Sequence, residues 1–361
     1  MGKKEQDARG KGQGLENKKL RRWEDEKLST SQPLNISSSQ IQDSSLVTRH
    51  SSLEKATRDA YGETLLELGK ERSDIVVLDA DLSGSTKTNK FAKAFPERFF
   101  NIGVSEQDMI GTAAGLSLTG KVPFASTFAV FETGRAWDQI RLAVCYSNTN
   151  VKLVASHGGI TVGEDGASHQ ALEDIALMRA LPNMTVIVPA DAAETSLVIK
   201  AIADYKGPVY VRLGRAAVPY VMPDDYKFKI GKAHIFRTGK DANIIAAGIM
   251  VDTAITAAGI LTEQGIDTGV INMSTIKPLD EKSLLSVAKN SKIIVTAEEH
   301  SVIGGLGSAV CEFLAENHPI PVKRIGVNDL FGCSGNPKEL LKLYGLTAEN
   351  IIETIKKALK K

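Results

Sequence analysis

The sequence has 361 residues, of which 42% are hydrophobic and 24% are charged, and its formal net charge is +1. These values are typical of a globular protein and give no general attraction to nucleic acid or to an anionic membrane. No apolar run is long enough to span a bilayer, so we expect a cytoplasmic chain without nucleic acid or membrane partners. The three cysteines, Cys145, Cys311 and Cys333, lack the spacing of a disulfide framework or a zinc site.

Residues 1–50 differ in composition from the rest of the chain. They are rich in Lys, Arg, Glu, Gln and Ser and show no sustained hydrophobic period. Such a segment cannot bury a core, and we predict a disordered polar tail. The run Lys18–Arg22 is also compatible with a basic interaction patch or a transit segment. The acidic run Glu24–Glu26 argues against a transit peptide, because transit peptides avoid acids.

From Thr57 onward, short apolar strands alternate with helical patterns. The predicted strands are Ile75–Leu78, Phe99–Gly103, Pro123–Thr127, Val151–Ala155, Thr185–Val188 and Val209–Leu213. The predicted helices are Thr57–Lys70, Glu106–Leu118, Gly134–Cys145, Ala171–Ala180 and Ala192–Ala203. This alternation indicates a parallel, doubly wound sheet.

A second α/β series follows the proline-containing polar stretch Pro219–Asp225, which we interpret as a linker. Its predicted strands are Ile244–Ala247, Thr268–Asn272, Ile293–Ala297 and Val322–Gly326. Its predicted helices are Val251–Gln264, Glu281–Asn290, Gly307–Glu316, Lys338–Tyr344 and Ala348–Lys360. The sequence therefore predicts two doubly wound α/β domains with mostly parallel sheets, at residues 51–222 and 223–361.

Glu106 opens the predicted helix Glu106–Leu118. An acid in a first helical turn is ordinarily explained by the helix dipole. The rest of this helix is nearly all apolar or small, which indicates that the helix is buried and withdraws its first carboxylate from water. A carboxyl group in such surroundings can share a proton near neutral pH. That property suits a hydrogen bond to a ring nitrogen of a heterocyclic cofactor.

Three phenylalanines, Phe124, Phe128 and Phe131, follow this helix. Phenylalanine near the end of a strand is ordinarily part of the core. If these rings lie close to Glu106, however, they would form the apolar wall on which a planar ring stacks.

The segment from His157 to Gln170 places two imidazoles and a carboxylate, those of His157, Asp165 and His169, on a glycine-rich stretch. It follows a predicted strand, and the carboxyl ends of strands are where α/β sheets bind ligands. Asp before Gly is also a common turn former. Two histidines flanking an aspartate nevertheless favour a functional site. Their spacing matches no familiar zinc pattern, and we expect no metal ligands in this chain.

Arginine at the end of a strand can clamp an anion or form an ordinary surface ion pair. Arg212 and Arg215 follow a predicted strand, and Arg58 lies in the first predicted helix. Two other motifs are incomplete. The sequence Gly305–Gly307 lacks the third glycine of a dinucleotide fingerprint. The sequence Glu164–Gly166 lacks the first glycine and the distant asparagine of a thiamine diphosphate and magnesium motif.

Several of these segments together resemble transketolase. They are Gly103–Glu106, Thr127–Phe131, His157–Gln170, Arg179–Met184 and Pro189–Asp191. The likeness runs from about residue 54 to the end and covers the pyrimidine-binding and C-terminal domains. The front domain with the diphosphate and magnesium motif is not part of it. The chain thus resembles the C-terminal subunit of a split transketolase.

The resemblance implies a role for each matching residue. Glu106 would pair with the aminopyrimidine of thiamine diphosphate as a catalytic residue, with Phe128, Phe131 and Asp81 around the cofactor. Gly134 falls where many transketolases have a third aromatic. The substrate-binding residues implied are Arg58, Ser85, His157, Asp165, His169 and Arg215, with His157 and His169 also catalytic.

The function implied is transfer of a two-carbon ketol unit from a ketose phosphate to an aldose phosphate. It requires thiamine diphosphate and Mg²⁺, with the metal and the diphosphate held by an N-terminal partner subunit in an α2β2 assembly. Three alternatives remain open: a subunit resembling 1-deoxyxylulose 5-phosphate synthase, the β-subunit of a 2-oxo acid dehydrogenase, and a non-catalytic scaffold with a transketolase-like fold.

Overall fold

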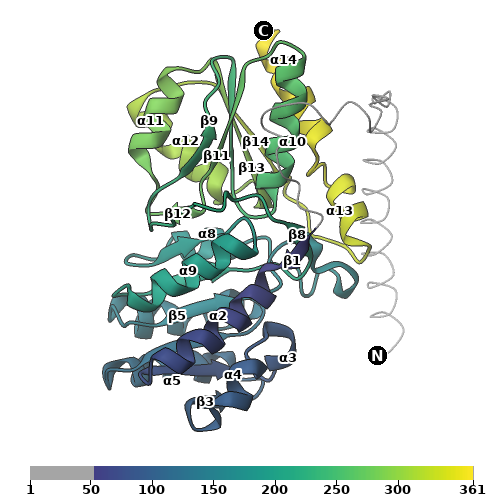
Figure 1. Cartoon of the computed structure of the whole chain (residues 1–361). Coiled ribbons are helices and arrows are strands. Elements are labelled where there is room, and N and C mark those ends of the chain that lie inside the picture. Colours follow the sequence, from purple (N-terminus) through teal and green to yellow (C-terminus); the bar gives the residue numbers. More distant parts are fainter. Residues whose placement is uncertain (1–52, 361) are drawn as a thin grey trace, which may run out of the picture. The chain divides into compact units, whose positions relative to one another are not determined.

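The computed structural model describes residues 53–360, so the predicted tail, residues 1–50, lies outside the described residues. The described chain is mixed α/β and contains a seven-stranded, a five-stranded and a two-stranded sheet (Figure 1). The two larger sheets are parallel except for one antiparallel strand each. The predicted fold class is therefore confirmed. None of the helices in residues 53–360 has the length and apolar character needed to cross a membrane.

The seven-stranded sheet has the order β12-β6-β7-β5-β4-β2-β3. Its strands are β2 (Ile75–Asp79), β3 (Phe99–Asn101), β4 (Val122–Ser126), β5 (Lys152–Ala155), β6 (Thr185–Ile187), β7 (Val209–Arg212) and β12 (Thr275–Lys277). The six strands predicted for this region are present, with ends displaced by one or two residues. All residues of the central strands β2, β4, β5 and β7 are buried, because a parallel sheet covered on both faces has no solvent side.

Helices cover both faces of this sheet. On one face, α2 (Thr57–Glu71) and α9 (Ala192–Asp204) share a core cluster through Tyr61, Leu65 and Ile199. On the other face, α5 (Glu106–Leu118) and α8 (Asp174–Arg179) belong to a second cluster. The short helices α3 (Ser83–Thr86), α4 (Asn89–Ala94) and η2 (Pro96–Arg98) lie between β2 and β3 in the chain.

The region of the predicted helix Gly134–Cys145 is helical, but its predicted start and continuity are wrong. The structure has instead α6 (Ala129–Arg135), α7 (Trp137–Gln139) and a π-helix η3 (Ile140–Tyr146). Phe128 has an extended backbone and ends the run from β4, so helix α6 begins five residues before the predicted start. The apolar run Phe128–Phe131 hid this start, because strand and helix core look alike over so short a stretch.

Two further predictions need correction around the His157–Gln170 segment. The predicted helix Ala171–Ala180 is shorter, because the Ala171 carbonyl accepts hydrogen bonds from Gly159 N and Arg212 Nη2 instead of a helical partner. The glycine-rich segment also contains a 3₁₀ helix, η4 (Ile160–Asp165), which is broken at Gly163.

The five-stranded sheet has the order β14-β13-β10-β11-β9. Its strands are β9 (His234–Arg237), β10 (Ala242–Ala246), β11 (Thr268–Asn272), β13 (Ile293–Ser301) and β14 (Val322–Val327). Its helices are α10 (Met250–Glu263), α11 (Glu281–Lys289), α12 (Leu306–Asn317), α13 (Pro337–Leu343) and α14 (Ala348–Leu359). Figure 1 shows α11 and α12 on one side of the sheet and α10 and α14 on the other. The sequence predicted these helices and four of the strands, and it missed the antiparallel edge strand β9.

Strand β12 belongs in sequence to the second α/β series but pairs antiparallel with β6 of the first sheet. The sequence predicted no strand there, because three residues are too few to show a period. Nearby, Lys277 Nζ donates to the carbonyls of Arg179 and Leu181 at 2.9 and 2.6 Å. A small antiparallel pair, β1 (Glu54–Ala56) with β8 (Ala217–Pro219), ties the start of α2 to the end of the first series. The pairing of β12 with β6 crosses the expected boundary between residues 222 and 223.

Lys152 is a buried polar side chain, and its replacement would measure how much its hydrogen bonds stabilise the first sheet. Its Nζ is inside the protein and donates to Asn150 Oδ1, Tyr205 O and Gly207 O at 2.7, 2.8 and 2.8 Å, which uses all three ammonium N–H bonds. We expect Lys152→Met to lower the free energy of unfolding in urea by about 2–4 kcal/mol, because two buried carbonyls lose their donor. The control Lys200→Met removes an exposed ion pair with Glu67 and should cost about 0–1 kcal/mol. Equal losses for the two variants would contradict this account.

Candidate functional site

The carboxyl ends of β4 and β5 bring the predicted aromatic and histidine side chains together. A bridge joins Phe128 to Ser156, and the Phe128 ring stacks on His157 with ring centroids 3.7 Å apart and planes 24° apart. Phe131 lies 5.9 Å from Phe128 with its plane at 16°, and His169 packs edge-on to Phe131 at 5.3 Å. Four predicted site residues thus form one aromatic cluster. Phe124 takes no part, because it is fully buried in the core on the α2 side of the sheet.

Glu106 is the first residue of α5 and is only 4% exposed, as its apolar helix led us to expect. Its Oε1 accepts a hydrogen bond of 2.9 Å from Arg135 Nη1. The same guanidinium lies over the Phe131 ring, with its carbon 4.1 Å from the ring centroid. Arg135 therefore joins the buried carboxylate to the aromatic cluster.

His157 is held in a fixed tautomer and a constrained backbone. Its φ of 61° is left-handed, and the next two amides donate to Leu213 O and Ala171 O. Arg58 Nη1 lies 3.3 Å from its Nε2, and Ser156 Oγ lies 2.8 Å from its Nδ1. Arginine can only donate, so Nε2 is the acceptor and Nδ1–H donates to Ser156. Burial, with the nearby charges of Arg58 and Arg215, lowers the pKa of His157 to about 3.

Both predicted substrate-binding arginines lie near His157, since the charges of Arg58 and Arg215 both lower its pKa. Arg58 Nη1 also donates to the backbone carbonyl of Ser85 at 3.1 Å, so Ser85 contributes its carbonyl rather than its hydroxyl to this contact. Arg215 donates to Val162 O and forms ion pairs of 3.2 Å with Glu164 and 3.7 Å with Asp165. Burial and the charge of Arg215 lower the pKa of Arg58. The two guanidiniums are therefore close enough to repel each other.

Two residues that the sequence suggested for ligand binding, Asp81 and Arg212, contact other protein groups instead. Asp81 is bonded to Asn101, whose Nδ2 donates to Asp81 Oδ1 at 2.9 Å, and it makes no hydrogen bond to the aromatic cluster. The prediction that Arg212 could bind an anion is wrong, because Arg212 is buried and its Nε donates to Asp174 at 2.8 Å. Within residues 53–360, no three His, Cys, Asp or Glu side chains are arranged to hold a metal ion.

Sequence reasoning missed Arg135 and Glu132, both on α6. The helical spacing of Arg135, four residues after Phe131, becomes visible only when α6 is placed at Ala129–Arg135. Glu132 is fully buried, and neither carboxyl oxygen has a hydrogen-bond partner among the described residues. Burial raises its pKa well above the ordinary value, and the nearby carboxylates of Asp79 and Glu106 raise it further. Glu132 therefore keeps its proton to a higher pH than an ordinary glutamate does.

Family models match both parts of the chain. The pyrimidine-binding domain of transketolase matches residues 54–221, and the transketolase C-terminal domain matches residues 231–351. The chain therefore belongs to the transketolase family.

Individual relatives narrow the relationship. The chain is 55% identical over 310 residues to a putative transketolase C-terminal section of Methanocaldococcus jannaschii, covering 85% of this chain and 97% of that protein. It is 43% identical to a 6-deoxy-6-sulfo-D-fructose transketolase subunit of a Clostridium species, covering 82% and 92%. A solved structure described as a split gene transketolase, inactive β4 tetramer, matches with a TM-score of 0.79 at 55% identity, covering 84% and 98%. This chain thus corresponds to the C-terminal section of a split transketolase.

The lowered pKa of His157 predicts how stability changes with pH. The unfolded histidine binds a proton below about pH 6.5, whereas the folded one stays neutral to about pH 3, so folding becomes less favourable as pH falls through this window. We expect the wild type to lose stability relative to His157→Gln by about 1.4 kcal/mol per pH unit between pH 6 and 4. Urea unfolding of both proteins at several pH values measures this difference. An NMR titration of His157 with a midpoint near pH 6.5 would contradict it.

The raised pKa of Glu132 predicts the opposite slope. Above about pH 4.3 the unfolded carboxyl ionises while the folded one keeps its proton, so folding becomes less favourable as pH rises. The variant Glu132→Gln is close in shape to the neutral acid and lacks this penalty. Its stability relative to the wild type should therefore increase as the pH rises above about 4.3, which urea unfolding at several pH values measures. A stability difference that does not change with pH would show that Glu132 is ionised in the folded protein.

Proposed function

We propose that this chain is the C-terminal subunit of a thiamine diphosphate-dependent transketolase, a transferase that moves a two-carbon ketol unit from a ketose phosphate to an aldose phosphate. One observation carries the proposal. A continuous set of contacts runs from the buried Glu106 carboxylate through Arg135 to Phe131, and on to His169. A withdrawn carboxylate beside flat aromatic rings suits an aminopyrimidine better than it suits a purely structural role.

The residues present fit the cofactor at its pyrimidine end. Phe128 and Phe131, stacked at 16°, would form one wall for the ring, and Glu106 would hold a proton at a ring nitrogen. Gly134 lies inside α6 and offers no third ring. When bound, thiamine diphosphate supplies the carbanion that attacks the ketose carbonyl. Side chains of this chain would perform the other functions of this half of the site.

The two histidines and Asp165 would form hydrogen bonds to the sugar and transfer protons at its hydroxyl groups. Because His157 stays neutral, its imidazole can exchange hydrogen bonds with a hydroxyl without the cost of burying a charge. His169, at the edge of Phe131, would move a proton at the donor hydroxyl as a general acid and base. Asp165, 3.7 Å from Arg215 Nη1, would accept a hydrogen bond from a substrate hydroxyl.

The charges around His157 favour a substrate with an anionic end. Arg58 and Arg215 repel each other, and an anion bound between them would relieve that repulsion. Ser85, whose carbonyl orients Arg58, lies at the same place. A sugar phosphate meets this requirement. So does a sulfonated sugar, the substrate class in the name of the Clostridium relative.

A second polypeptide would complete the site. Asp81 would approach the cofactor from this chain, and the diphosphate and Mg²⁺ would be held by an N-terminal subunit in an α2β2 assembly. One finding supports this: the split gene transketolase structure that this chain resembles at 55% identity is described as an inactive β4 tetramer.

The alternative functions differ in the donor or in the acceptor that they use. The reconstituted complex should transfer a ketol unit to ribose 5-phosphate. Transfer to glyceraldehyde 3-phosphate with pyruvate as donor would indicate a deoxyxylulose phosphate synthase, and acyl transfer to a lipoyl domain would indicate a 2-oxo acid dehydrogenase. Partner binding without any turnover would indicate a scaffold.

Glu106→Gln tests the central residue. In the complex with the N-terminal subunit, thiamine diphosphate and Mg²⁺, we expect kcat for ketol transfer to fall by about 10²–10³, because an amide cannot exchange the proton at the ring nitrogen. The control Asp108→Asn changes an exposed acid in the same helical turn and should keep activity within about twofold. An active Glu106→Gln enzyme would refute the role, and robust activity of the chain without a second polypeptide would refute the split site.

A further inference from the structure

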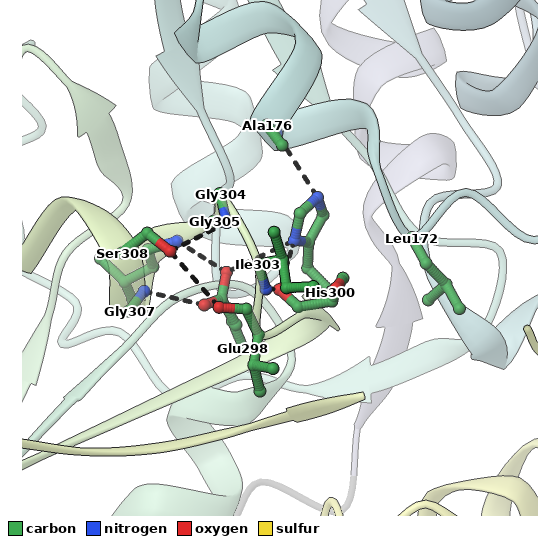
Figure 2. Close-up of polar contacts among 12 residues, drawn as sticks. Leu172, Ala176, Glu298, His300, Ile303, Gly304, Gly305, Gly307 and Ser308 are labelled. Atoms are coloured by element: carbon green, nitrogen blue, oxygen red, sulfur yellow. Dashed lines mark hydrogen bonds and ion pairs between the residues drawn. The ribbon is translucent and has the colours of Figure 1, made fainter. Parts of the chain in front are cut away.

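Two adjacent glutamates on β13 face opposite ways, as successive residues of a strand do. Glu298 contacts only the C-terminal half of the chain through these bonds and caps α12. Its carboxylate accepts hydrogen bonds from Leu306 N and Gly307 N at 2.7 and 2.8 Å (Figure 2). A side chain at Gly305 would overlap its carboxylate, which explains Gly305 without a nucleotide. Glu298 is therefore a structural N-terminal cap of helix α12.

Glu299 reaches instead into the other half of the chain. Its Oε1 accepts a 2.7 Å hydrogen bond from Thr161 N, in the 3₁₀ helix η4 between His157 and His169. Gly159, with φ of 83°, lies against the same carboxylate, and a side chain there would overlap it. The backbone of the histidine-bearing segment therefore rests directly on Glu299.

The surroundings of Glu299 make this contact firm. The carboxyl group is fully inside the protein, and its pKa is raised by burial against the opposing influence of Arg212 and Thr161. Arg212 Nη2 donates to Glu299 O at 2.8 Å and to Ala171 O at 3.0 Å. A buried carboxyl that loses a hydrogen bond cannot turn to water, so the Thr161 contact is costly to break.

The far end of the same segment is also held by residues of the second series. Gln170 Nε2 donates to Ile160 O at 3.1 Å and to Cys333 O at 3.0 Å. Ser334 Oγ donates to Glu164 O at 2.5 Å. The acceptors in both contacts are backbone carbonyls, so these contacts hold the backbone path of the segment.

We propose that Glu299 is a positioning residue for the candidate site. By holding Thr161 N it sets the path of residues 157–170, and so the places of His157, Asp165 and His169. The sheet of the C-terminal half would then shape the site as well as take part in assembly. The effect on turnover rests on the proposed function, whereas the effect on the loop does not.

Hydrogen–deuterium exchange of the chain by itself tests the structural step. Glu299→Ala should speed exchange of the Thr161 amide about tenfold, the equivalent of one lost hydrogen bond of about 1.4 kcal/mol. Glu299→Gln keeps an acceptor oxygen and should restore exchange to within about threefold of the wild type. The matched control Glu298→Gln should change exchange at Leu306 and Gly307 and leave the Thr161 amide unchanged. If Glu299→Ala does not fold, Glu299→Asp, which withdraws the carboxylate by one methylene, replaces it.

Unchanged Thr161 exchange in a folded Glu299→Ala or Glu299→Asp variant overturns the proposal. So does an equal effect of Glu298→Gln on the loop, because Glu299 would then act only through the stability of the sheet.

Kinetics of the reconstituted complex test the consequence for the site. Glu299→Asp should lower kcat/KM for the ketose phosphate about tenfold and leave the affinity for thiamine diphosphate unchanged, and Glu299→Gln should recover most of the loss. Normal kcat/KM in a variant with a loosened loop overturns the positioning role. A wild-type complex that transfers no ketol unit overturns the proposed function instead, and the exchange result stands apart from it.

Discussion

The constraint on which the rest of the structure depends is the buried guanidinium of Arg212. It pairs with Asp174 at 2.8 Å and donates to the carbonyls of Ala171 and Glu299, so one side chain binds strand β7, helix α8, the end of the histidine-bearing loop and strand β13. A buried ion pair adds little net stability, but removing one partner leaves an uncompensated charge. Gly158 passes so close to Arg212 that a side chain there would overlap it. The path of the loop past Arg212 therefore leaves no room for a side chain at position 158.

That path decides the electrostatics of the candidate site. It turns His157 into the left-handed region, against Phe128 and beside Arg58, where its pKa is lowered to about 3. On α6, Arg135 donates to the buried Glu106, while the carboxyl oxygens of Glu132 have no hydrogen-bond partner among the described residues and burial raises the pKa of Glu132. The candidate site thus contains a paired carboxylate, a carboxyl group with a raised pKa, an imidazole with a lowered pKa and two arginines.

Much of the fold could be predicted from local pattern. Strand β2 is an apolar run that ends in an aspartate, and α5 has an apolar face formed by Met109, Ile110, Ala113 and Ala114. The failures have physical reasons. Strands β9 and β12 are short antiparallel edges without a measurable period, and the start of α6 was hidden because an apolar run fits a strand and a buried helix equally well.

For the site, the sequence by itself determined which residue types are available: Glu106 at a helix start, the phenylalanines after β4, and two histidines flanking Asp165 on a glycine-rich segment. Those follow from local spacing, and the family likeness rests on them. Only the tertiary structure decided which partner each one has. Arg135 bonds Glu106 from 29 positions away, and Glu299 supports Thr161 from 138 positions away. Such contacts leave no periodic signal in the chain, because they depend on how distant helices, loops and strands pack rather than on neighbouring residues.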